Sequence, residues 1–167
     1  FIADDGTHGI ELWLTDGTAA GTSLLKDIRP GAADSGNLET TITALGTGKA
    51  VFRANDGVSG EELWVTDGTA GGTSLLKDLS AGSANSFPAY ITALGNGKAV
   101  FQANDGTNGA EIWITDGTQA GTSLLKDLRA GSASSFPYHF GALGDGRGVF
   151  SAHDRTVGSD LWITDGT

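Results

Sequence analysis

One short pattern, repeated four times at nearly constant spacing, constrains the fold of this chain more than any other feature. Its clearest copy is Glu61 to Thr69, which reads Glu-Glu-Leu-Trp-Val-Thr-Asp-Gly-Thr. The tryptophan recurs in steps of 51, 49 and 49 residues, and these positions account for all four tryptophans: Trp13, Trp64, Trp113 and Trp162. A period of this length predicts small units that stack on one another and share their hydrophobic cores.

Each unit reads as four short β-strands joined by tight turns. In the unit that begins at Ile91, the expected strands cover residues 91–94, 98–103, 111–115 and 122–127. The segments between them are rich in Gly, Asn and Asp, which tight turns favour, and the third strand alternates polar and apolar residues. No stretch has the apolar spacing of three and four residues that a helix needs. The chain is therefore predicted to be all-β.

A repeat of about 40 to 50 residues with four antiparallel strands is typical of a β-propeller blade. The expected units are a partial blade, two whole blades and a second partial blade, at residues 1–28, 42–79, 91–128 and 140–167. Longer crossovers rich in Ala, Gly and Ser join them, at 29–39, 80–88 and 129–137.

About three and a half blades do not close a propeller ring, and a partner is therefore expected at the open sheets. That partner is either further blades of the same chain or a second copy of it. The sequence begins with Phe1 inside a repeat and contains no methionine. Both features indicate a piece of a longer chain, or a processed one.

The spacing Ala-x-Asp-x-x-x-Gly-x-x-x-Trp is kept in all four repeats. Its alanines are Ala3, Ala54, Ala103 and Ala152, and its glycines are Gly9, Gly60, Gly109 and Gly158. This spacing resembles the tryptophan-docking motif of quinoprotein-type propellers. The resemblance implies that each indole packs between neighbouring blades, that the alanine makes room for it, and that the aspartate and glycine shape the turn. A buried tryptophan contributes about 150 to 250 Å² of contact, which suits a blade-to-blade contact.

The flanking residues carry a second resemblance, which covers the whole chain. The segments Glu11 to Thr22, Glu62 to Thr73 and Glu111 to Thr122 resemble the ELW-x-x-DGT tandem repeats of large exported bacterial proteins. The resemblance implies secretion or display at the bacterial cell surface, and it implies little about chemistry. In the last repeat Asp160 replaces the glutamate and Arg155 replaces a turn glycine, so that turn is expected to differ.

The repeated aspartates allow two interpretations. Asp5, Asp56, Asp105 and Asp154 are candidate calcium ligands, and so are Asp16, Asp67, Asp116 and Asp165. Calcium needs six to eight oxygen ligands, and neither the EF-hand spacing nor the glycine-rich nonapeptide is present. An aspartate two or three residues before a glycine commonly accepts hydrogen bonds from the backbone N–H groups of its own turn. We interpret these aspartates as turn caps and keep calcium as the alternative.

Composition excludes several classes of function. The net charge of −10 argues against binding of nucleic acid through phosphates, and no apolar run is long enough for a membrane span. There is no cysteine for a disulfide or a thiolate metal site. The histidines occupy three non-equivalent places in the repeat, His8, His139 and His153. No residues are therefore assigned to catalysis, and no cofactor is expected.

Two further features of the repeat concern the surface. Aromatic residues flank the crossover prolines at Phe87, Tyr90, Phe136 and Tyr138. We interpret them as plugs between blades, with a rim that stacks on sugar or grips a protein partner as the alternative. The fourth strand repeats Lys-Asp at residues 26–27, 77–78 and 126–127, interpreted as a charged outer edge that prevents aggregation. A ring of lysines facing an acidic glycan is the alternative.

The function favoured by these features is a non-enzymatic extracellular scaffold with a structural or adhesive role, which contacts protein or carbohydrate at its rim. The residues repeated most strictly have turn or core roles, which leaves none for chemistry. A quinoprotein-like oxidoreductase is one alternative, suggested only by the docking motif. A multivalent lectin-like binder with one weak site per blade is the other.

Overall fold

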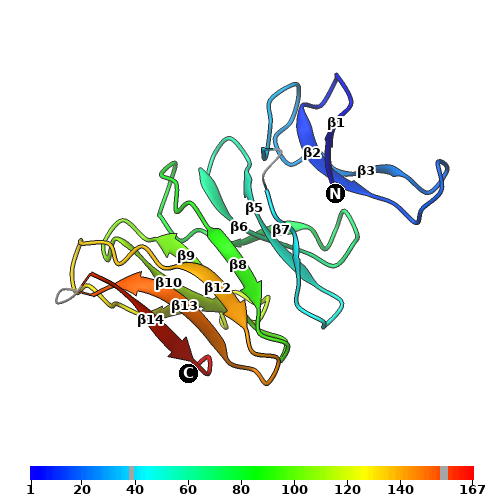
Figure 1. Ribbon diagram of the computed structural model, residues 1–167. Helices are drawn as coiled ribbons and strands as arrows, with labels where there is room; N and C mark the ends of the chain where they lie inside the picture. Colours follow the sequence, from blue (N-terminus) through cyan, green and yellow to red (C-terminus); the bar gives the residue numbers. More distant parts are fainter. Residues whose placement is uncertain (38–39, 155–157) are drawn as a thin grey trace.

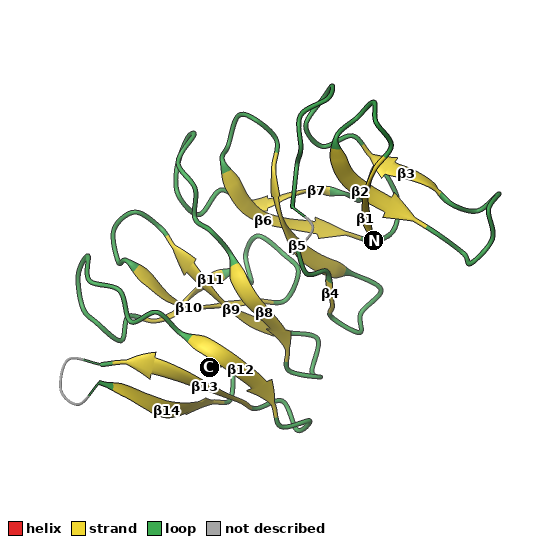
Figure 2. Ribbon diagram, turned by 45° about the horizontal axis from the view of Figure 1, so that its top comes forward, coloured by secondary structure: helices red, strands yellow, loops and turns green. Residues whose placement is uncertain are grey.

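The computed structural model describes residues 1–37, 40–154 and 158–167, and these residues form strands, turns and loops without a helix. The strands make up four separate antiparallel sheets, which follow one another along the chain (Figures 1 and 2). Sheet 1 contains β1 (Ile2–Asp4), β2 (Ile10–Leu14) and β3 (Ser23–Lys26). Sheet 2 contains β4 (Thr43–Ala44), β5 (Ala50–Asn55), β6 (Glu61–Thr66) and β7 (Ser74–Lys77). Sheet 3 contains β8 (Ala89–Ala93), β9 (Ala99–Asn104), β10 (Ala110–Thr115) and β11 (Ser123–Lys126), and sheet 4 contains β12 (Tyr138–Ala142), β13 (Gly148–His153) and β14 (Ser159–Thr164).

Within each sheet every strand pairs with the next one along the chain, so each sheet is a simple meander. The described strands number three, four, four and three in sheets 1 to 4, as the repeat predicts. The all-β prediction is confirmed for the described residues. The strand that carries the tryptophan meets the strand after it at a register shift beside the tryptophan, for example between Leu63 and Trp64 of β6. The same shift recurs in sheets 1 and 3.

The turn after the strand that carries the tryptophan is stabilised by hydrogen bonds to its own side chains. In sheet 2 the Asp67 carboxylate accepts hydrogen bonds from the backbone N–H of Thr69, at 2.9 Å, and from its hydroxyl, at 2.7 Å. The hydroxyls of Thr66 and Thr73 lie 2.7 Å apart and tie the two strands together. Equivalent bonds occur in sheets 1 and 3. The Asp-Gly-Thr sequence is thus explained by its local hydrogen bonds.

The sheets pack on one another through three hydrophobic clusters. Because side chains alternate along a strand, Leu63 and Trp64 of β6 point to opposite sides of sheet 2. Trp64 lies in a cluster with Leu12 and Ile28 of the preceding repeat, whereas Leu63 lies in a cluster with Trp113 of the following one. Each sheet therefore has a tryptophan face and a leucine face, and the tryptophan faces of sheets 2, 3 and 4 meet the leucine faces of sheets 1, 2 and 3.

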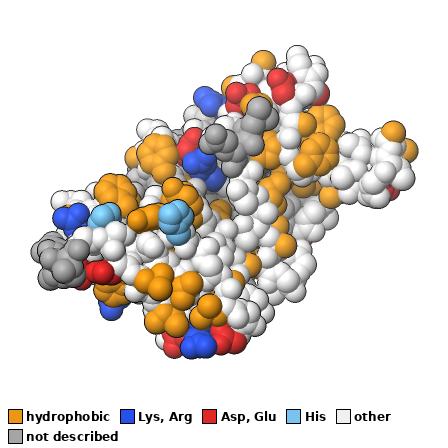
Figure 3. All heavy atoms as spheres, viewed as in Figure 1, with side chains coloured by type: hydrophobic (Ala, Val, Ile, Leu, Met, Phe, Trp, Pro, Cys, Tyr) orange, Lys and Arg blue, Asp and Glu red, His pale blue; other side chains and the backbone are white. Residues whose placement is uncertain are grey.

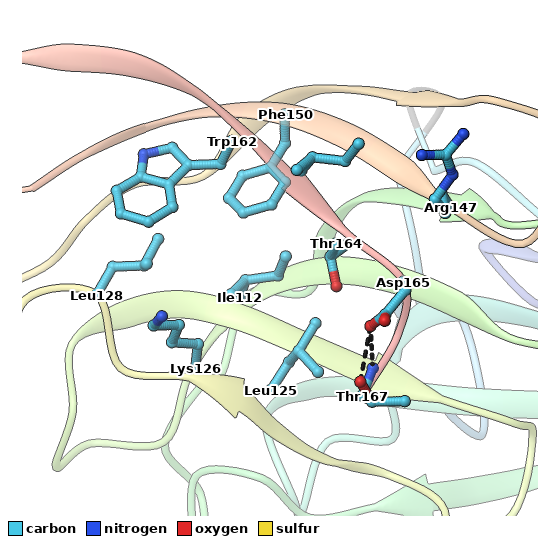
Figure 4. Close-up of a pocket in the computed structure, with 11 residues that line it drawn as sticks. Ile112, Leu125, Lys126, Leu128, Arg147, Phe150, Trp162, Thr164, Asp165 and Thr167 are labelled. Carbon is cyan, nitrogen blue, oxygen red and sulfur yellow. Dashed lines mark hydrogen bonds between the residues drawn. The ribbon is translucent and has the colours of Figure 1, made fainter.

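The third cluster lies between sheets 3 and 4 and is open on one side. Figure 4 shows Trp162 and Phe150 of sheet 4 facing Ile112, Leu125 and Leu128 across a pocket of about 380 Å³. The Lys126 ammonium lies 5.9 Å from the centre of the Trp162 ring. Trp13 and Trp162 are half-buried, while Trp64 and Trp113 are buried. Trp64 and Trp113 lie on strands that have a neighbour on each side, whereas Trp162 lies on the edge strand β14 and no described sheet covers the face that carries Trp13.

Lysines connect consecutive sheets. The ammonium groups of Lys26 and Lys77 donate hydrogen bonds of 2.6 Å to the backbone carbonyls of Thr73 and Thr122, each in the next repeat. Lys49 and Lys98 bond in the same way to the carbonyls of Gly117 and Gly166, as a second pair of connections. The interpretation of the Lys-Asp pairs as a freely exposed outer edge is wrong for Lys26 and Lys77, because their ammonium groups are occupied between sheets.

The aspartates of these pairs bond within their own repeat. One carboxylate oxygen of Asp27, of Asp78 and of Asp127 accepts a hydrogen bond from the backbone N–H of the glycine four residues later. The Lys-Asp pairs therefore begin the crossovers and join sheets, which leaves little of them for an external ligand.

Candidate functional site

The site is built on a buried carboxylate that repeats with the tryptophan. Glu11, Glu62 and Glu111, which precede the leucine or isoleucine of the pattern, are fully buried. The Glu62 carboxylate accepts hydrogen bonds from the N–H of Leu79 at 2.8 Å, and from the N–H and hydroxyl of Ser86 at 2.9 and 2.7 Å. These donors come from the crossover that leaves the sheet, so each glutamate clamps both ends of a crossover.

The other two glutamates make the same clamp. Glu111 accepts from Leu128 N–H at 2.9 Å and from the Ser135 hydroxyl at 2.6 Å, and Glu11 accepts from Ile28 N–H at 2.9 Å and the Ser35 hydroxyl at 2.7 Å. Burial raises the pKa of Glu11 and of Glu62, and the hydrogen bonds that each carboxylate accepts oppose part of that rise. A buried carboxylate with N–H and O–H donors is a structural support for the crossover.

The clamped serine comes directly before an exposed phenylalanine. Phe87 follows Ser86 and has φ of 50°, and Phe136 follows Ser135 and has φ of 46°. Both lie in the left-handed region that bulky residues avoid, and the prolines after them are buried. The rings of Phe87 and Phe136 are 51% and 55% exposed. The backbone is thus held in an unfavourable conformation, and the ring it carries faces solvent.

The second residue after each of these prolines also has a positive φ and is exposed. Tyr90 has φ of 56° and is 56% exposed, and His139 has φ of 52° and is exposed. Both lie at register shifts of the first strand, between Ala89 and Thr92 and between Tyr138 and Gly141. Such a bulge lets one side chain turn away from the sheet.

We call Phe87, Tyr90, Phe136, Tyr138 and His139 the aromatic surface. Tyr138 is half-buried, its hydroxyl lies 2.9 Å from that of Ser159, and its ring centre is 4.6 Å from that of His139. The strands β8 and β12 lie side by side, and Figure 3 shows hydrophobic and histidine side chains gathered over this region. The interpretation as plugs between blades is wrong for Phe87, Tyr90 and Phe136, because more than half of each side chain is exposed.

A pocket of about 280 Å³ adjoins the aromatic surface at Tyr90. Beside the tyrosine it is lined by two hydroxyl side chains, one guanidinium group and three apolar residues, namely Thr40, Thr41, Arg53, Pro88, Ala89 and Ile91. Arg53 lies 3.8 Å from a Glu61 carboxylate oxygen, so its charge is partly balanced. The pocket therefore offers an aromatic wall and several hydrogen-bond donors.

The repeated aspartates before the third strand cap turns. One oxygen of Asp5, Asp56 or Asp105 accepts two backbone N–H bonds of 2.7 to 2.9 Å from the residues two and three positions later. The second oxygen bonds the side chain of His8, Ser59 or Asn108. The capping interpretation is confirmed for these three. The turn after Asp154 includes residues 155–157, so the expectation for Arg155 lies outside the described residues.

These hydrogen bonds also change acidity. The backbone N–H of His8, followed by its side chain and the N–H of Thr7, lowers the pKa of Asp5 to about 2. In turn the Asp5 carboxylate raises the pKa of His8. Within the described part of the chain, no group of three or more His, Asp or Glu side chains is arranged to hold a metal ion.

The motif glycines lie where a crossover passes close to the turn. Gly109 has φ of 72°, and a Cβ there would lie 2.8 Å from the Ala133 backbone. Gly9 meets Ala33 in the same way, and a Cβ at Gly60 would overlap the carbonyl of Ala84. Gly158 has φ of 99°, but no described atom lies within 4 Å of its Cβ position. Three of the four glycines are thus needed for both their φ and the close crossover.

Sequence reasoning missed the glutamate and serine clamps, although both residue types repeat at fixed places.

None of the described segments forms a helix of the length and hydrophobicity needed to cross a membrane. Comparison of the chain with family models, with curated proteins and with solved structures gives no match.

Proposed function

We propose that the four sheets are blades of a β-propeller. Each sheet is a meander of three or four described strands, and sheets 2, 3 and 4 each pack their tryptophan face on the sheet before them, which is the arrangement that a propeller requires. In this proposal Trp64, Trp113 and Trp162 are the blade-to-blade contacts that the docking motif implies, and Trp13 presents the same face at the first blade.

This module is a non-enzymatic extracellular scaffold, and the aromatic surface is where it holds its partner. The resemblance to the ELW-x-x-DGT repeats supports an exported bacterial protein. The observation that carries the proposal is the left-handed φ of Phe87, Tyr90, Phe136 and His139. A bulky residue in this region costs roughly 1 to 2 kcal/mol, and such strain concentrates at functional sites. Here it serves only to turn side chains outward, in two consecutive repeats.

A carbohydrate fits this surface best. Aromatic rings offer flat apolar faces to sugar rings, and the pocket beside Tyr90 adds the hydroxyls of Thr40 and Thr41 and the guanidinium of Arg53 as hydrogen-bonding groups. The strands β8 and β12 lie side by side, and each carries one part of the aromatic surface or directly follows it. A glycan with several sugar units would contact both copies, so weak contacts would add through multivalency.

A glycan array followed by calorimetry tests the proposal, with a double variant in which Phe87→Gly and Tyr90→Gly remove two rings. Glycine accepts positive φ, so the variant is expected to keep its stability within about 1 kcal/mol. Removing a central aromatic contact typically costs more than about 1 kcal/mol of binding, so affinity is expected to fall about tenfold or more.

Val58→Gly is the control, because Val58 is also exposed and belongs neither to the aromatic surface nor to the lining of the pocket beside Tyr90. It is expected to bind glycan like the parent chain. A parent chain that binds no glycan, or a double variant that binds as tightly as the parent, would contradict the proposal.

A further inference from the structure

Besides the aromatic surface and the turn residue Val58, the exposed large apolar side chains lie on the first and last sheets. On sheet 4 they are Leu143, Leu161 and Ile163. On sheet 1 they are Leu14, which lies on the same side of β2 as Leu12, and Phe1, which has the half-buried Trp13 beside it at a ring distance of 6.4 Å. The positions of these residues in the repeat identify which faces they belong to.

The residues on sheet 4 belong to its leucine face. Leu161 precedes Trp162 as Leu63 precedes Trp64, and Leu143 corresponds to Leu94. Leu63 and Leu94 are fully buried in clusters with the following sheet, whereas Leu161 is 76% exposed. The leucine face of sheet 4 is therefore an apolar surface, and the same face of each of the three preceding sheets is covered by a tryptophan face.

Phe1 and Trp13 belong to the tryptophan face of sheet 1. Phe1 corresponds to Phe52, Phe101 and Phe150, all of which are buried between sheets, and it is 48% exposed. Trp13 corresponds to the three tryptophans that meet a leucine face. One chain thus carries, at opposite ends, the two halves of a contact that it already makes three times internally.

We propose that these two faces bind each other between copies of the chain, so that sheet 1 of a second copy packs on sheet 4 of the first. The occupant is a second copy because the matching tryptophan face is present on this same chain. The contact joins two different surfaces and is therefore head-to-tail, which gives a closed ring or a longer array. Two copies would place eight sheets in one ring, within the range known for propellers.

The internal contacts also predict a polar bond at this interface. Lys49 and Lys98 each donate to the carbonyl of the Asp-Gly glycine in the next sheet. The corresponding residue of sheet 4 is Arg147, which is exposed and pairs with Asp145 at 2.7 Å. In the second copy the corresponding acceptor is the carbonyl of Gly17. The head-to-tail contact therefore reproduces both the apolar cluster and its flanking bond.

Sedimentation velocity of the 167-residue chain tests the proposal, over a range of concentrations and at moderate salt, which screens repulsion between chains of net charge −10. The expected result is a species of at least twice the 17.0 kDa chain mass. Leu161→Glu is expected to give monomers, and Val58→Glu, at a residue equally exposed at 74% but on neither face, is expected to associate like the parent.

A mixing experiment distinguishes a head-to-tail contact from one between identical faces. Phe1→Glu disables the tryptophan face and Leu161→Glu disables the leucine face, so each variant alone is expected to be monomeric. An equimolar mixture retains one intact face of each kind and is expected to form a one-to-one dimer.

Three outcomes would overturn the proposal: a parent chain that stays monomeric, a Leu161→Glu chain that associates like the parent, or a mixture that stays monomeric. The proposal rests on the packing of the sheets and is independent of the partner at the aromatic surface. Glycan binding by a monomeric Leu161→Glu chain would keep the proposed function whatever the outcome of mixing.

Discussion

The second glycine of the Asp-Gly-Thr-x-x-Gly turn is required by the aspartate of its own turn. A Cβ at Gly72 would overlap the Asp67 carboxylate, whereas no described atom lies within 4 Å of the Cβ position at neighbouring Gly71. To make room, Asp67 would have to leave the two bonds it accepts from Thr69. We expect Gly72→Ala to lower the melting temperature by about 3 °C, and Gly71→Ala to leave it unchanged or slightly higher because it restricts the unfolded chain.

Thermal unfolding followed by circular dichroism measures both variants. The cause is isolated by repeating Gly72→Ala in a chain that carries Asp67→Ala, where the overlap is gone and the further loss should disappear. Equal melting temperatures for Gly72→Ala and Gly71→Ala would show that the contact has no energetic role.

At the scale of single residues, the sequence predicted the turns but not the exposed rings. Asp56 and Asp67 act on residues two or three positions away, so their spacing to Gly, Ser and Thr reveals the role. The outward turn of Phe87 depends on its φ and on a serine held by a glutamate 24 residues earlier. An aromatic residue next to proline fits a core plug equally well by composition, and only the backbone distinguishes the two.

At the scale of one sheet and its crossover, the buried glutamate should be sensitive to loss of its charge. The Glu62 carboxylate uses two acceptor oxygens for three donors from Leu79 and Ser86. A glutamine has only one acceptor oxygen, and its amide would face an N–H or O–H donor. We expect Glu62→Gln to cost about 1 to 3 kcal/mol of unfolding free energy, measured by urea denaturation.

The adjacent Glu61 provides a matched control, because it lies on the same strand and its carboxylate is paired with Arg53 at 3.8 Å. Glu61→Gln is expected to change stability by less than about 1 kcal/mol, as is usual for partly exposed ion pairs. If Glu62→Gln and Glu61→Gln changed the unfolding free energy equally, the crossover would be held by its backbone contacts alone.

The strands and their order in each sheet could be predicted from sequence, whereas the clamps could not. Alternation in β6 and β10 and the Gly-rich turns around them are local signals, and they give meanders directly. The repetition of Glu11, Glu62 and Glu111 is just as visible. A glutamate in a strand is ordinarily exposed, however, and the donors to Glu62 lie 17 and 24 residues away, so the repetition alone does not reveal the clamp.

At the scale of the whole molecule, the repeat predicted how many strands each sheet contains, but not how consecutive sheets are joined. The alternation of Leu63 and Trp64 gives every sheet two apolar faces, so stacking follows from the pattern. The lysine bonds cross from one repeat to the next over 45 to 68 residues, and an exposed lysine at a strand end looks the same in sequence. Stability therefore depends on contacts between repeats that single repeats do not reveal.

The pH dependence of stability is a property of all repeats together and should have a maximum in mild acid. Glu11, Glu62 and His8 have raised pKa values in the folded protein, through burial for the glutamates and through Asp5 for the histidine. Each binds its proton more readily when folded, so stability rises as pH falls from neutral towards their ordinary values of 6.5 and 4.5. Asp5, with its pKa lowered to about 2, opposes them below its ordinary value of 3.8.

Below that value protons bind these aspartates more readily in the unfolded chain than in the folded one, so stability is lost as the pH falls from 3.8 to about 2. The turn aspartates contribute to the same loss, since hydrogen bonds from threonine lower the pKa of Asp16, Asp67, Asp116 and Asp165. Melting temperatures measured across this range should rise and then fall, and Asp5→Asn should make the acid loss shallower. A melting temperature that falls steadily from neutral pH would mean that burial does not raise the pKa values of Glu11 and Glu62, and this result would contradict the prediction.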